Sequence, residues 1–170
     1  MKYSFLIAVL FFFQIGFSQQ NIFDVARKGT VEEVKSIIKQ NPDAINSVNE
    51  EGYSPLILAC YRGNIEVVKF LIKEVKDING NSSMGTPLMA AVVKGNKEIV
   101  QVLLENKAGP NFTDANGTTA LIYAVQFNNS SIVKLLLDYK ADRSKIDDKG
   151  KTAFEYAAFS NNEEIINLLK

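Results

Sequence analysis

A block of small and aliphatic residues recurs four times along the chain at nearly constant spacing. The copies begin at Gly52, Met84, Gly117 and Gly150, which are 32, 33 and 33 residues apart. A second block, in which a Gly-Asn or Asn-Asn turn precedes aliphatic residues, follows each first block in the same register. A fainter copy of this second block begins at Gly29. A fixed period near 33 residues is the sequence signature of a solenoid.

The copy that begins at Met84 predicts two short helices joined by a turn. Thr86 is suited to cap a helix, and Pro87 follows at the first helical position, where no backbone N–H is needed. Gly95 opens the turn, and the aliphatic residues within 99–104 then line one face of a second helix. Because one pair of such short helices cannot bury its own apolar face, the units must stack.

Two segments match the reciprocal capping box, in which a capping threonine and a glutamate three residues later each bind the other's backbone amide. They are Thr30 with Glu33 and Thr152 with Glu155. We expect a helix to begin directly after each of these threonines.

The repeated blocks resemble the ankyrin repeat over roughly residues 20–170. The motif Gly-x-Thr-Pro-Leu-x-x-Ala-Ala is most complete at 84–92 and 52–60, and Gly-Asn-x-Glu-Ile/Val-Val-x-x-Leu-Leu at 63–72 and 95–104. The resemblance implies an all-α ankyrin-repeat solenoid of about five stacked helix-turn-helix units with β-hairpin-like connecting turns. Within a domain of residues 19–170, the expected units are 20–50, 51–83, 84–116, 117–149 and 150–170.

The chain departs from the family pattern at two kinds of position. The family's usual histidine after Pro-Leu is replaced by Ile57, Met89, Ile122 and Glu155. We therefore expect its hydrogen bond to the capping threonine to be missing. The family's glycine at the end of the second helix is replaced by Val75, Lys107 and Lys140. Where the backbone there is left-handed, each replacement costs about 1 kcal/mol. We expect the stack to be weakest at the irregular connection 73–83.

The N-terminus has the layout of a secretory signal peptide. Lys2 supplies a positive charge, residues 5–13 are apolar, and Gly16 and Ser18 offer a cleavage site. A membrane anchor would need about 20 apolar residues, and a buried helix would need a polar face. We expect cleavage after residue 18. The short, Phe-rich signal resembles those of exported Gram-negative proteins, so we expect a periplasmic location, with secretion to the medium as the alternative.

Composition excludes several classes of function. Lys+Arg and Asp+Glu both count 19, and a net charge of zero argues against a nucleic-acid binder. With no histidine and one cysteine, the chain lacks the commonest general base and the usual zinc ligands. Cys60 falls at a small position of the repeat, and we expect it to be buried. We therefore expect no catalytic residue, no metal site, no cofactor and no enzymatic activity.

The positions that do not repeat are the candidates for a binding surface. In ankyrin-like stacks, the turn tips and the exposed side of the first helix form a concave recognition surface, as the resemblance implies. Mapped by register, the candidate partner-binding residues are Tyr53, Tyr61, Arg62, Val93, Lys94 and Phe127. Aromatic and arginine side chains commonly anchor interfaces. The alternative is that some of these side chains only cover the seams between units.

Two function classes remain open. The first is a non-catalytic protein-protein interaction module of the cell envelope, with a scaffold, inhibitor or immunity-like role. The second is a released effector or stress-protection protein that acts on a target outside the periplasm. In both cases we expect a monomer that binds another protein, without nucleic acid and without membrane insertion after signal cleavage.

Overall fold

The computed structural model describes residues 21–170, so the proposed signal peptide at 1–18 lies outside the described residues. The described chain forms ten α-helices and one 3-10 helix, which confirms the expected all-α repeat architecture. The elements are α1 Ile22–Lys28, α2 Val31–Gln40, η1 Pro42–Asn46, α3 Pro55–Arg62, α4 Ile65–Glu74, α5 Pro87–Val93, α6 Lys97–Glu105, α7 Ala120–Gln126, α8 Ser130–Asp138, α9 Ala153–Ser160 and α10 Glu163–Leu169. Between residues 21 and 170, no helix has the length and apolar character needed to cross a membrane.

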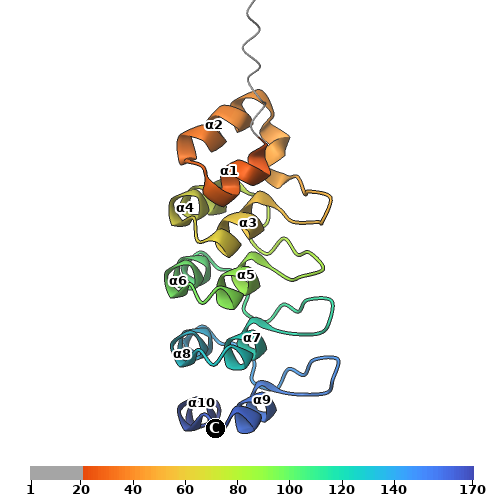
Figure 1. Ribbon diagram of the computed structural model, residues 1–170, viewed down its shortest axis with the longest axis vertical. Coiled ribbons are helices and arrows are strands. Elements are labelled where there is room, and N and C mark those ends of the chain that lie inside the picture. The colour runs from red at the N-terminus through yellow and green to blue at the C-terminus, as the bar shows by residue number, and fades with distance from the viewer. Residues whose placement is uncertain (1–20) are drawn as a thin grey trace, which may run out of the picture.

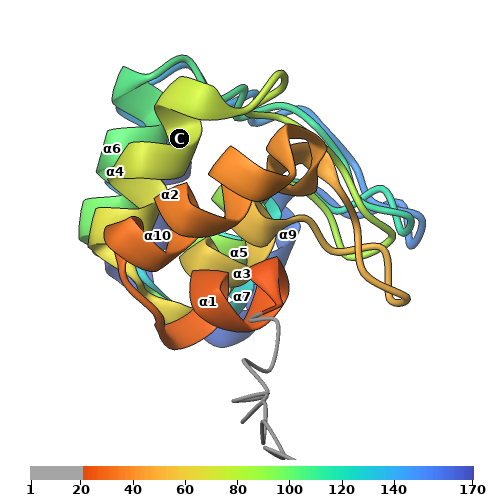
Figure 2. The same ribbon diagram turned by 90° about the horizontal axis from the view of Figure 1, so that it is seen from above.

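The helices stack in two parallel rows (Figure 1). The odd-numbered helices α1 to α9 form the inner row, and the even-numbered helices α2 to α10 form the outer row. The connections between successive pairs project to one side as a series of tips, which nearly superpose when viewed along the stack (Figure 2). Three tips contain one antiparallel bridge each, as expected for β-hairpin-like turns. The bridges are Ser82–Gly85, Thr113–Thr119 and Ile146–Thr152.

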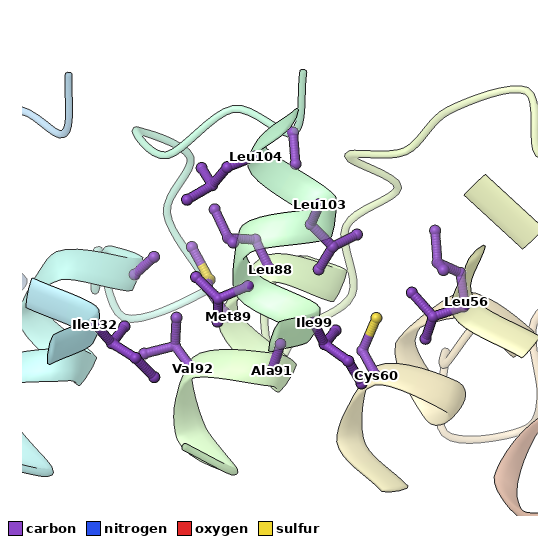
Figure 3. Close-up of a cluster of buried hydrophobic side chains, with 14 of the residues drawn as sticks. Leu56, Cys60, Leu88, Met89, Ala91, Val92, Ile99, Leu103, Leu104 and Ile132 are labelled. Carbon is purple, nitrogen blue, oxygen red and sulfur yellow. The ribbon is translucent and has the colours of Figure 1, made fainter. Parts of the chain in front are cut away.

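The core lies between successive helix pairs and repeats with the sequence. Leucine at the second position of α3, α5 and α7 is 1% exposed in each case, namely Leu56, Leu88 and Leu121. Figure 3 shows this apolar cluster around α5 and α6. Cys60 of α3 belongs to the same cluster and is fully buried, which confirms the expectation for this residue. Burial raises the pKa of the Cys60 thiol, so the side chain behaves as a small apolar group.

Both expected capping boxes are present. The amide of Thr30 donates to Glu33 Oε2 at 2.8 Å, and the amide of Thr152 donates to Glu155 Oε2 at 2.7 Å. The threonine hydroxyls accept the return bonds from the glutamate amides. Glu155 also accepts a bond from the Thr152 hydroxyl at 2.8 Å. At Glu155 a carboxylate thus bonds to the capping threonine in place of the family's histidine, at the site where the capping box was expected.

Two of the three helix ends without the family's glycine adopt left-handed backbone. Lys107 has a φ of 68° and Lys140 a φ of 65°, whereas Val75 is extended, with a φ of −72°. The connection after α4 leaves the helix along a different path, so no glycine is needed there. Of these three positions, Lys107 and Lys140 therefore carry the conformational cost of a side chain at positive φ, and Val75 does not.

Glycine at these two positions is expected to stabilise the fold. Lys107→Gly and Lys140→Gly should each raise the free energy of unfolding by about 0.5–1 kcal/mol, partly offset by the greater entropy of the unfolded chain. Urea midpoints measure the effect. Val75→Gly is the control and should lower the midpoint, since its backbone is ordinary. Midpoints that fall for both lysine variants would contradict the prediction.

A ladder of asparagines connects the first four units in succession. The side chains of Asn46, Asn79 and Asn111 each accept a hydrogen bond from a backbone amide about thirty residues later. The donors are Lys76 at 2.9 Å, Gly109 at 2.7 Å and Asp142 at 2.7 Å. The first two bonds involve the irregular connection 73–83, which is therefore bonded to the units on both sides.

Candidate functional site

A groove with a volume of about 480 Å³ lies on the inner row, beside the bases of the tips. Its walls include five of the six residues expected to bind a partner, namely Tyr53, Tyr61, Arg62, Val93 and Phe127. The sixth, Lys94, lies at the edge, with its ammonium 4.9 Å from the centre of the Tyr61 ring. The fold thus brings all six candidates to one surface that spans three inner helices.

The repeat register explains why these side chains meet. Tyr61 and Arg62 end α3, Val93 ends α5, and Lys94 and Phe127 are the residues that follow the last turns of α5 and α7. Each unit repeats its neighbour's geometry, so equivalent helix ends form a continuous strip. Tyr61 is 43% exposed and Phe127 is 54% exposed. Large apolar side chains are therefore available along the strip.

Tyr123 also lines the groove and is not among the six residues expected from the sequence. Its ring stacks on Phe127, with ring centres 6.4 Å apart and planes 25° from parallel. The position of Tyr123 is occupied by Leu58, Ala90 and Tyr156 in the other inner helices, so its residue type varies between units. The same criterion of variation, applied one turn earlier in the helix, could have found this residue.

Two of the tips each have an aspartate at the base that hydrogen-bonds both to the tip backbone and to a tyrosine of the inner helix. Asp114 Oδ1 accepts from the amides of Asn116 and Thr118, both at 2.9 Å. Its Oδ2 accepts from the Tyr123 hydroxyl at 2.5 Å. Burial and this hydrogen bond raise the pKa of Tyr123 to about 12. The ring of Tyr123 is therefore held at the groove wall by a neutral hydroxyl that donates to a carboxylate.

The same arrangement recurs one unit later at Asp147. This carboxylate accepts from the amides of Lys149 and Lys151, both at 3.0 Å, and from the Tyr156 hydroxyl at 2.5 Å. Burial alone would raise the pKa of Asp147, but the hydrogen bonds from Tyr156, Lys151 and Lys149 outweigh it and lower the pKa. The ionised carboxylate is the form that the fold favours.

Stability is therefore expected to depend on pH through Asp147. A carboxyl group whose pKa is lowered by folding stabilises the fold above its unfolded value of about 3.9, and this contribution is lost as pH falls through the folded pKa. Asp147→Asn should show a smaller loss of unfolding free energy than the wild type below about pH 4. Urea titrations at several pH values measure this, with Tyr156→Phe as an intermediate case. If the unfolding free energies of the wild type and of Asp147→Asn fall in parallel as the pH is lowered, the prediction is contradicted.

Comparison with known proteins gives the family. The family model described as "Ankyrin repeats (3 copies)" matches residues 22–114 and 106–170. "Ankyrin repeat and SAM domain-containing protein 6" of Rattus norvegicus is 35% identical over 64 residues, which is 38% of this chain and 7% of that protein. "BTB/POZ domain-containing protein 3" of Schizosaccharomyces pombe is 42% identical over 50 residues, which is 29% of this chain and 10% of that protein.

A third relative is "Alpha-latrocrustotoxin-Lt1a" of Latrodectus tredecimguttatus, with 36% identity over 58 residues, or 34% of this chain and 4% of the toxin. The matches thus span at most a tenth of the length of these relatives. Ankyrin repeats generally mediate protein-protein interaction and are typically non-catalytic. With family matches that together run from residue 22 to residue 170, this chain belongs to the ankyrin-repeat family.

Proposed function

We propose that this chain is a non-catalytic module that holds a partner protein in the groove between its inner helices and its tips. The observation that carries the proposal is the contrast between neighbouring positions of one helix. Cys60 repeats as a small or aliphatic residue and is fully buried, whereas Tyr61 does not repeat and is 43% exposed. Exposed aromatic side chains grouped on one surface are typical of interaction sites.

Site-specific crosslinking in the source cells tests this proposal. A photoreactive amino acid is introduced at Tyr61 or Phe127 in the groove, and at the exposed outer-row positions Gln101 or Lys134 as controls. We expect one partner protein to be crosslinked from both groove positions and from neither control. Crosslinks formed equally from the outer row, or from it alone, would place recognition on another face.

We also propose that the module acts in the cell envelope after export. This rests on the order of charge, apolar run and small residues in 1–18. The alternative role as a released effector or stress-protection protein predicts that the protein accumulates in the medium. Fractionation of the source cells separates these two roles, since the first requires retention in the periplasm.

Export predicts a mature chain that begins at Gln19. Intact-mass analysis of protein recovered from the envelope or the medium should show the loss of residues 1–18. A variant with a charge in the apolar run, Leu6→Arg, serves as the control and should keep the full-length mass, because a charge in this run impairs recognition as a signal. Wild-type protein that retains Met1 in the envelope fraction would contradict the prediction.

A further inference from the structure

Acidic side chains are unevenly distributed between the two rows of helices. The inner helices α3, α5 and α7 contain no aspartate or glutamate, although the whole chain has as many acidic as basic residues. The cations at the ends of these inner helices are Arg62 and Lys94. Neither takes part in any of the three ion pairs formed within residues 21–170. Among the described residues, the two cations at the inner wall of the groove therefore have no acidic partner in an ion pair.

No acidic group of the described tips forms an ion pair with Arg62 or Lys94. Among the described residues that line the groove, Glu51 is the one carboxylate, and its Oε2 accepts from the side-chain amide of Asn49 at 3.3 Å. Asp114 is buried and does not line the groove, and its oxygens already accept three hydrogen bonds. Arg27, the other cation that lines the groove besides Arg62, is paired with Asp24 at 2.9 Å. Arg62 and Lys94 thus remain the positions where a partner could supply the missing negative charge.

The aromatic neighbours make these two cations suited to an anionic ligand. The Lys94 ammonium lies over the face of Tyr61, which restrains it without using its capacity to donate hydrogen bonds. The guanidinium of Arg62, on the exposed residue next to Tyr61, presents the fork that fits a carboxylate. Arg62 and Lys94 occupy equivalent places at the ends of adjacent inner helices, and the axes of packed helices commonly lie about 8–10 Å apart. Such a spacing suits two acidic residues of one short segment.

We infer that the partner of the groove contributes an acidic and apolar peptide segment. Its carboxylates bind Arg62 and Lys94, and its apolar side chains pack against Tyr61 and Phe127. This inference rests on the proposed function and specifies the chemistry of the partner. A nucleic acid fits less well, because its affinity depends on many phosphate contacts, and the chain has no excess of positive charge.

A peptide selection tests the inference with the protein as it exists. A random peptide library displayed on phage is selected on the immobilised mature chain, and the enriched peptides are synthesised. We expect aspartate and glutamate to be enriched beside leucine or phenylalanine. Binding of these peptides should weaken about tenfold in the double variant Arg62→Gln/Lys94→Gln, and it should weaken with added salt. The control Lys97→Gln/Lys134→Gln removes the same charge from the outer row and should bind normally.

The outcomes separate this inference from the proposed function. Neutral or basic peptides whose binding is lost in Tyr61→Ala and Phe127→Ala would overturn the acidic partner and leave the groove as the binding site. Peptides that bind all the groove variants equally, or a selection without enrichment, would overturn both. If a random single-stranded oligonucleotide displaces the acidic peptides, Arg62 and Lys94 bind phosphate groups, and the inference of a peptide partner is overturned.

Discussion

Asp114→Ala is expected to lower the free energy of unfolding by about 3 kcal/mol. The Asp114 side chain accepts three hydrogen bonds and is 7% exposed, so its removal leaves the Thr118 amide and the Tyr123 hydroxyl without their partner. A buried donor without a partner costs about 1–3 kcal/mol, and hydrogen bonds to charged groups contribute about as much each. Urea unfolding of the wild type and the variant measures the difference.

Two further variants separate the contributions of this carboxylate. Tyr123→Phe removes only the bond to Oδ2 and should cost about 1 kcal/mol. Asp114→Asn keeps an oxygen for the amides of Asn116 and Thr118 and should lie between the other two variants. An unchanged midpoint for Asp114→Ala would mean that the backbone bond from the Asp114 amide to the Thr118 carbonyl, at 3.1 Å, is sufficient to hold the tip.

Tyr61→Ala and Phe127→Ala are each expected to weaken binding of the crosslinked partner by roughly thirtyfold. Truncation of an aromatic anchor at an interface commonly costs 2 kcal/mol or more, which corresponds to a change of about this size in Kd. Both side chains are substantially exposed, so their loss should change the urea midpoint little. Affinity and urea midpoint are measured on the same preparations, with Gln101→Ala as the control on the outer row.

The paired measurement distinguishes recognition from structural cover of the seams between units. If Tyr61 and Phe127 only cover the seams, the variants should lose stability without a specific loss of binding. The Phe127 ring stacks on Tyr123, and the Lys94 ammonium lies over the Tyr61 ring. Each aromatic residue therefore also contacts another residue of the solenoid. Unchanged affinity in two stably folded variants would place recognition elsewhere, such as the tips near Asn116 and Lys149.

The periodicity of the sequence predicted the fold well because it reports apolar burial. The same register that aligns Leu56, Leu88 and Leu121 also places the groove side chains at equivalent helix ends. The ladder of asparagines could not be predicted in this way, because its bonds join a side chain to a backbone amide in another unit. Hydrophobic spacing carries no information on such bonds.

Local chemistry explains the remaining differences between expectation and structure. Val75 stands at a position where the family has glycine, but the path of the chain after α4 removes the need for positive φ there. Glu155 replaces a histidine and still bonds to the capping threonine, because the capping box already directs its carboxylate to that place. Tyr123 varies between units as the expected residues do, but it lies one turn before the helix ends where those residues were expected, and hydrophobic spacing gives no sign of its bond to Asp114.

The ladder formed by Asn46, Asn79 and Asn111 has a consequence for cooperativity. In a stack of repeats, stability is the sum of the intrinsic free energy of each unit and the coupling between neighbours. Each ladder bond belongs to the coupling, since opening one unit removes the acceptor of an amide in the next. Strong coupling makes partly opened stacks rare. Amides in the central helices should therefore exchange their hydrogens with solvent mainly when the whole array opens, and those of the terminal helices should exchange earlier.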